Sequence, residues 1–110
     1  MTSMDPERER VVRLLIADVV DTLGPNCQKI VQWELPNILE LTDTVDSFAE
    51  RLVEEVQQYI LDSFIDTTWP SCPRHPKHPL WFHDGAWWCE QDGVAIVGLG
   101  ELYARGTGAA

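Results

Sequence analysis

WPSCPRHPKHPLWFHDGAWWCEQDG, residues 69–93, sets the architecture of the C-terminal part of the chain. Within it, Asp84-Gly85 is a strong signal for a two-residue hairpin, because a type I′ turn needs positive φ at both central positions and Asp-Gly tolerates this. The turn joins two short runs of strand-favouring residues, 80–83 and 86–89, and a third run follows at 94–97. The sequence therefore predicts a three-stranded antiparallel meander.

Counting outward from the turn gives the register of the hairpin. Residues at equal distances from a two-residue turn face each other, and successive side chains alternate between the two faces of the sheet. The alternation puts Trp81 and Trp88 on one face and Phe82 and Trp87 on the other. The predicted pairs are His83 with Ala86, Phe82 with Trp87, Trp81 with Trp88, and Leu80 with Cys89.

The N-terminal part of the chain has helical periodicity instead. Residues 5–23 form a predicted helix, with Asp5 as its cap, Pro6 in its first position and Gly24 after its end. A second helix begins after a cap at Thr42 or Asp43 and carries an amphipathic stripe. The stripe consists of Val45, Phe48, Leu52, Val56, Tyr59, Ile60 and Phe64.

The segment between these helices, residues 26–41, fits a helical face and a strand alternation about equally. We favour a short helix that Pro36 ends, because proline lacks the N–H that an interior helical position needs. The predicted fold is α+β, with two or three N-terminal helices packed on the meander. Its parts are a helical segment at 1–68, the Trp/Cys/His-rich module at 69–105 and a disordered tail at 106–110.

The formal charge of −10 disfavours nucleic-acid binding, since that affinity comes mainly from Lys and Arg. Residues 1–68 carry −9 of this charge and residues 69–110 carry −1.

We expect a cytoplasmic protein, because no run of sequence is long and apolar enough for a membrane span and the N-terminus has no signal-peptide layout. We expect it to be a monomer or a homodimer.

Potential metal ligands flank the predicted hairpin. Cys72 and His75 precede its first strand in a Cys-Pro-x-His turn, and Cys89 and Asp92 follow its second strand in a Cys-x-x-Asp turn. Two such turns can bring four donors to one end of the sheet, which is the arrangement that tetrahedral zinc needs.

These two turns make residues 69–98 resemble the zinc-ribbon family, in which two Cys-x-x-Cys-type turns flank a hairpin. The resemblance implies that Cys72, His75 and Cys89 are ligands of a structural zinc ion. Where the family has a fourth Cys or His, this chain has Asp92. His78, His83 or water are alternatives for the fourth ligand. The Trp-Pro-x-Cys-Pro-x-His tract is also similar to segments of small bacterial proteins whose activity is uncharacterised.

Other interpretations of the same residues stay open. The module can be a ribbon that has lost its metal, with Cys72 and Cys89 as buried thiols, or it can hold another metal or a redox pair. A catalytic zinc would need an open coordination position and a nearby base, for which Glu90 and Asp92 are the obvious candidates.

The tryptophans bear on partners, because four of the five lie in the module. One face of a small sheet packs on the helices, so we expect an exposed patch that includes Trp81, Trp88 or Trp87. Trp is enriched at the energetic centres of protein interfaces. The sequence therefore predicts a non-enzymatic protein-interaction or regulatory protein with a structural zinc-ribbon-like module. The alternatives are a nucleic-acid-binding ribbon and a metal-dependent enzyme.

Overall fold

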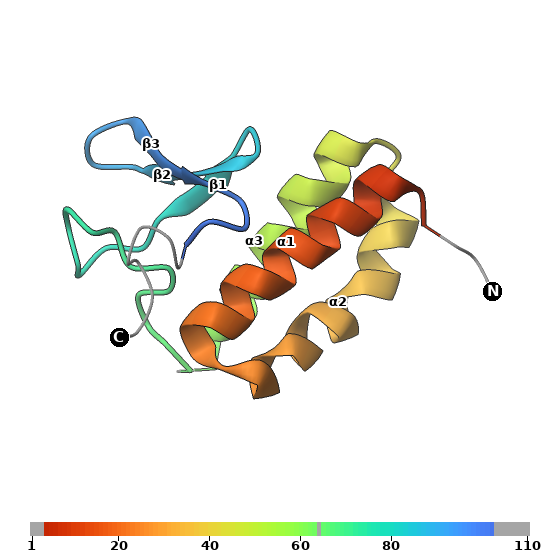
Figure 1. Ribbon diagram of the computed structural model, residues 1–110, viewed down its shortest axis with the longest axis horizontal. Helices are drawn as coiled ribbons and strands as arrows, with labels where there is room; N and C mark the ends of the chain where they lie inside the picture. The colour runs from red at the N-terminus through yellow and green to blue at the C-terminus, as the bar shows by residue number, and fades with distance from the viewer. Residues whose placement is uncertain (1–3, 64, 103–110) are drawn as a thin grey trace.

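Three helices are followed by a three-stranded antiparallel sheet in the computed structural model, which describes residues 4–63 and 65–102 (Figure 1). The α+β fold class that the sequence predicts is confirmed. The predicted tail at 106–110 lies outside the described residues. The elements are α1 (Pro6–Leu23), a 3-10 turn (Pro25–Cys27), α2 (Gln28–Leu41), α3 (Val45–Asp62), β1 (Trp81–His83), β2 (Ala86–Cys89) and β3 (Val94–Gly98).

Helix α1 has the bounds that its capping residues predict. The side chain of Asp5 accepts a hydrogen bond from the Arg8 amide at 2.8 Å, and proline occupies the first turn. At the other end Gly24 has a φ of 96°, which L side chains rarely adopt, and its amide donates to the Val20 carbonyl at 2.9 Å. The cap residues therefore determine the length of this helix.

Helix α2 is longer than the sequence predicts. Pro36 lies inside it, so the prediction that this proline ends the segment is wrong. Proline inside a helix costs about 3 kcal/mol, and burial on both sides of the proline offsets this, because Ile30, Val31 and Ile38 are all buried. The helix ends at Leu41, and the hydroxyl of the following residue, Thr42, donates to the Ile38 carbonyl at 2.7 Å.

Helix α3 begins at Val45, and its cap is Thr44. The sequence predicted a cap at Thr42 or Asp43. The Thr44 hydroxyl accepts a hydrogen bond from the Ser47 amide at 3.1 Å. Its inward face supplies much of the core, while Tyr59, which belongs to the predicted stripe, is 37% exposed. The buried apolar residues of α3 are Phe48, Leu52, Val53, Val56 and Ile60.

The sheet has the order β1-β2-β3 and the predicted hairpin register. Trp81 pairs with Trp88, Phe82 with Trp87 and His83 with Ala86. The ladder begins at Trp81, so the predicted pair of Leu80 with Cys89 lies beyond it. Strand β3 runs one residue further than predicted, to Gly98, and a bulge interrupts its pairing between Trp87 and Trp88.

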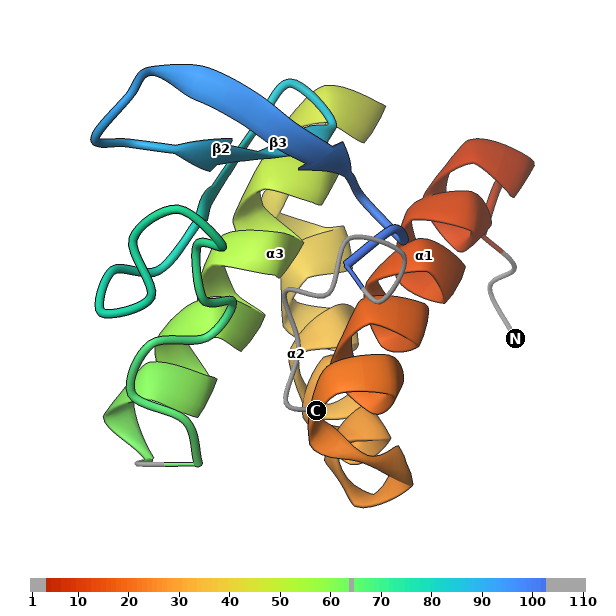
Figure 2. The ribbon, with the colours of Figure 1, turned by 60° about the vertical axis from the view of Figure 1, so that its left-hand side comes forward.

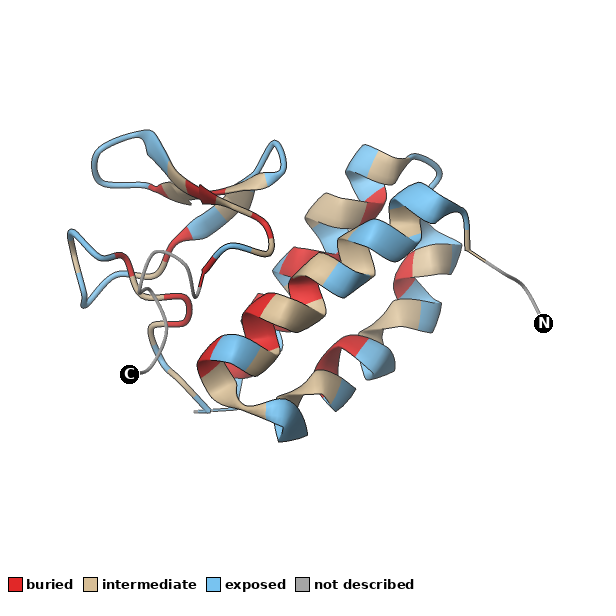
Figure 3. Ribbon diagram, viewed as in Figure 1, coloured by how far each residue is buried: buried red, intermediate tan, exposed pale blue. Residues whose placement is uncertain are grey.

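The sheet packs against α1 and α3 through its inner face (Figure 2). Trp69 and Trp87 are buried at this boundary, with ring centroids 5.5 Å apart in an edge-to-face arrangement. Gln57 of α3, also buried, donates from Nε2 to the carbonyls of Trp69 at 3.2 Å and Leu80 at 2.7 Å. Figure 3 shows buried residues on both sides of the boundary, and they form one continuous core.

None of the described helices combines the length and the apolar character that crossing a bilayer requires.

Candidate metal centre

The turn that carries Cys72 and His75 is closed by backbone hydrogen bonds. The amide of Cys72 donates to the carbonyl of His78 at 3.0 Å, and that of His75 donates to the carbonyl of Cys72 at 3.2 Å. An isolated bridge between Ser71 and Pro79 closes the base of the loop. Prolines at four positions of residues 69–79 fix φ and limit the conformations that the loop can adopt. The backbone of the turn that carries Cys72 and His75 is therefore held by its own hydrogen bonds and by its prolines.

The turn that carries Cys89 and Asp92 joins β2 to β3. The amide of Gly93 donates to the carbonyl of Cys89 at 2.8 Å, and Gly93 has a φ of 67°, in the left-handed region that favours glycine. The amide of Asp92 lies 3.4 Å from the Cys89 sulfur and donates to it. Backbone donors of this kind stabilise a thiolate, and their presence favours a ligand role for the sulfur.

Three of the four predicted ligands converge. The ligand atoms of His75, Cys89 and Asp92 all lie within 4.8 Å of one another, and His75 Nε2 is 3.2 Å from Asp92 Oδ2. Cys89 is buried, whereas the side chains of His75 and Asp92 are about one third exposed. This group could hold a metal ion, with a buried sulfur on one side and two donors accessible from solvent on the other.

The remaining predicted ligand, Cys72, is buried and lies near Cys89, but it is not among the three residues of this group. Burial raises the pKa of the Cys89 thiol, and the interaction with the Cys72 thiol adds to the increase. A divalent ion would reverse the effect, because a coordinating thiol is deprotonated by the charge of the metal. The two thiols therefore lie close together in an environment where a cation would stabilise both as thiolates.

The alternative histidines do not join the group. The ring of His78 lies 6.4 Å from that of His75, and His78 belongs to no ligand cluster among the described residues. His83 lies at the opposite end of the hairpin, where its Nδ1 is 3.6 Å from Glu50 and its Nε2 is 3.4 Å from Asp84. The sequence alternatives for a fourth ligand thus reduce to Asp92 and water.

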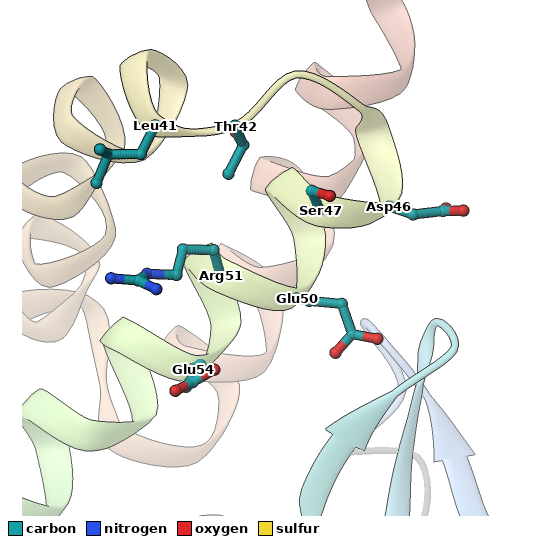
Figure 4. A pocket seen from close by; sticks show the side chains of 7 residues that line it. All are labelled: Leu41, Thr42, Asp46, Ser47, Glu50, Arg51 and Glu54. Carbon is teal, nitrogen blue, oxygen red and sulfur yellow. The ribbon is translucent and has the colours of Figure 1, made fainter.

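The cluster of Glu50, His83 and Asp84 is a second group that could hold a metal ion. All three side chains are at least 42% exposed, and exposed acidic groups of this kind are common without a metal. Figure 4 shows Glu50 directed from α3 toward the hairpin, while Arg51 points the other way across a shallow pocket. The contact of Glu50 with His83 therefore links α3 to the tip of the hairpin.

Sequence reasoning missed Arg74 as a neighbour of the site. Its Nε lies 3.1 Å from Asp92 Oδ2, so this carboxylate is shared between Arg74 and His75. The available signal was the position of Arg74 inside the first turn, next to a predicted ligand. An exposed pair like this contributes little to stability, but it orients the carboxylate toward the first turn.

The predicted protein-binding tryptophans occupy different environments. Trp87 is fully buried, so the expectation that it takes part in a contact surface is not met, because its indole fills the core against α1. Trp81 is 38% exposed and Trp88 is half-buried. Trp33 of α2, which was not among the predicted contact residues, is 56% exposed.

Asp18 of α1 is the other residue that sequence reasoning missed. Its carboxylate is buried and accepts hydrogen bonds from Trp87 Nε1 at 2.9 Å and from the amides of Gly100 at 2.7 Å and Leu102 at 3.0 Å. The signal was its spacing, which puts an acid on the same helical face as Leu15, Val19 and Thr22.

Burial raises the pKa of Asp18 even though these donors act in the opposite direction. The folded protein therefore binds the Asp18 proton more tightly than the unfolded chain does, where the pKa is near 3.8. The part of the Asp18 contribution to stability that comes from binding this proton is then largest at acid pH and is lost as the pH rises through the raised pKa. We expect the free energy of unfolding of the native protein, minus that of Asp18→Asn, to increase from pH 7 to pH 4. Urea titrations of both proteins at each pH would measure this difference, and a flat or falling difference would contradict it.

A scan against protein-family models found no match, and searches of curated proteins and of solved structures found none either. The resemblance to zinc ribbons therefore rests on the residues of the two turns and on their arrangement around the hairpin.

Proposed function

We propose that the C-terminal module holds a structural zinc ion, with His75, Cys89 and Asp92 as ligands and Cys72 as the fourth. The observation that carries this proposal is the convergence of three ligand atoms within 4.8 Å from two turns that are far apart in the sequence. Tetrahedral zinc with bonds of about 2.0–2.3 Å places its ligand atoms about 3.3–3.8 Å apart. The distances in the present group, 3.2 Å between His75 Nε2 and Asp92 Oδ2 and at most 4.8 Å between any two of the three ligand atoms, bracket that spacing.

A structural role is supported better than a catalytic one. Both sulfurs are buried, and a closed site with four protein ligands leaves no position for a substrate or a reactive water. The ion would instead cross-link the loop before β1 to the turn after β2. Because this module contributes only three short strands of three to five residues, such a cross-link would supply much of its local stability.

The proposed function of the whole chain is non-enzymatic interaction with another protein, for which the zinc module provides the binding surface. Two features support this. Trp81 and Trp88 lie opposite each other in the register and are not buried, and partly exposed tryptophans of this kind are common at interface centres. The acidic helical segment would favour a partner with a basic surface.

Metal content tests the first part of the proposal. We expect about one zinc per chain by elemental analysis of protein purified without a histidine tag, and loss of that zinc in Cys72→Ser and in Cys89→Ser. Cys27→Ser is the matched control, because Cys27 is a free, partly buried thiol at the start of α2, outside the ligand clusters. A folded protein without metal would refute the zinc site, as would equal loss of zinc in the Cys27 variant.

A further inference from the structure

A shallow cleft next to the candidate metal centre combines aromatic walls with an acid. It is lined by Trp81, His83, Trp88, Cys89, Glu90 and Gly93. The cleft lies on the face of the hairpin opposite to the core, because the neighbouring residues Phe82 and Trp87 turn inward and pack against each other at 5.7 Å. Two tryptophans therefore remain available to a ligand from solvent.

One wall of the cleft is held in place. The indole Nε1 of Trp88 donates to the carbonyl of His83 at 2.7 Å, and the His83 ring contacts the Trp88 ring with centroids 6.0 Å apart at 63°. Trp81 lies directly across the ladder from Trp88. A fixed aromatic surface binds with a smaller loss of side-chain entropy than a mobile one.

With His83 counted as neutral, the charge among the residues that line the cleft is negative. Glu90 is the only carboxylate among its lining residues, and neither Lys nor Arg lines it. Within residues 4–63 and 65–102, Glu90 makes no ion pair, whereas the nearest acidic residue along the chain, Asp92, is paired with Arg74. An acidic residue without an ion pair, in a cleft that two tryptophans also line, favours a cation with a flat or apolar body.

We propose that this cleft binds an arginine side chain of the protein partner. A planar guanidinium can stack on an indole ring while its N–H groups donate to a carboxylate, and it is more weakly hydrated than an ammonium group. In the cleft the guanidinium lies over Trp81 and Trp88, and Glu90 accepts its hydrogen bonds. The net charge of −10 attracts a basic segment to the same surface. This inference rests on the proposed interaction function and names the chemistry that the partner presents.

The probe for this site is N-acetyl-arginine methylamide, with the citrulline analogue as its neutral, nearly isosteric match. Titration of each into ¹⁵N-labelled full-length protein would be followed by NMR through the indole N–H signals. We expect the arginine compound to shift the signals of Trp81 and Trp88 with millimolar affinity, and the citrulline compound to shift them little. Trp81→Ala and Glu90→Gln should each weaken binding by about two- to fivefold, the range of a cation–π or exposed charge contact.

Trp33→Ala and Glu54→Gln are matched controls, because Trp33 is an exposed tryptophan on α2 and Glu54 is an exposed acid on α3. The proposal would be overturned if the citrulline compound bound as tightly as the arginine compound. It would also be overturned if the control variants weakened arginine binding as much as Trp81→Ala and Glu90→Gln do, because the arginine compound would then be attracted to the acidic protein in general. If Trp81→Ala fails to fold, Glu90→Gln still tests the proposal, because Glu90 is exposed and its replacement should leave the fold intact. Zinc content is measured on the same samples. Arginine binding without zinc would refute only the metal site, and zinc without arginine binding would refute only this cleft.

Discussion

Replacing Asp18 by alanine should lower the free energy of unfolding by about 3–5 kcal/mol, the usual cost of breaking a buried, hydrogen-bonded charge network. The side chain is fully buried, and it accepts hydrogen bonds from the Trp87 indole and from two backbone amides that follow β3. Alanine removes the acceptor and leaves the buried Trp87 Nε1 without its partner. The measurement is urea-induced unfolding followed by far-UV circular dichroism.

Asp21→Ala is the control for this substitution. Asp21 lies one turn away on the same helix and is exposed, so its replacement should change stability by no more than about 0.5 kcal/mol. If Asp18→Ala were as stable as Asp21→Ala, the hydrogen bonds between α1 and the C-terminal module would carry no net stability.

The second large effect concerns the metal. If zinc binds the folded protein and not the unfolded chain, saturating it at about 1,000 times the dissociation constant adds about 4 kcal/mol to the free energy of unfolding. For a domain of this size that corresponds to a rise in the melting temperature on the order of 15 °C or more. Removing the metal with a chelator should reverse the rise, and differential scanning calorimetry would record both changes.

The cysteine variants separate specific from nonspecific stabilisation by zinc. Cys89→Ser should abolish the rise in melting temperature, because it removes the sulfur from the group of His75, Cys89 and Asp92. Cys27→Ser should keep it, since Cys27 lies at the N-terminus of α2, outside that group. A rise of the same size in both variants would show that the ion acts elsewhere on the acidic surface.

The hairpin was predictable because its determinants are local. Asp84 and Gly85 both have positive φ, at 49° and 76°, as a type I′ turn requires, and the register of the neighbouring residues follows from that turn alone. The bounds of α1 were predictable for the same reason, since Asp5 and Gly24 act within a few residues of themselves. Local rules were sufficient for these elements.

The features that the sequence did not reveal depend on contacts between distant residues. Pro36 is tolerated inside α2 because residues on either side of it are buried by other elements, which no local rule anticipates. The same holds for Trp87, which alternation could assign to a face without deciding which face is covered. Asp18 was missed because its hydrogen-bond partners lie 69 to 84 residues away along the chain.

The candidate site shows both situations. The three-residue spacing within each turn places His75 next to Cys72 and Asp92 next to Cys89. This spacing is visible in the sequence. That neither His78 nor His83 joins the group follows from the path of the proline-rich loop and from the direction of the hairpin, which the spacing does not reveal. His83 was placed at the far end of the hairpin by the turn that precedes β2, and there it contacts α3.

The long sequence separation of the Asp18 contacts has a consequence for the order of folding events. A carboxylate on α1 stays hydrated until the hairpin and the residues after β3 dock on it, so its dehydration and its three hydrogen bonds accompany that docking. Closing loops of this length is slow compared with helix formation. We infer that these bonds are largely absent from the transition state and act by retarding unfolding. Asp18 would then determine how long the native structure persists more than how quickly it forms.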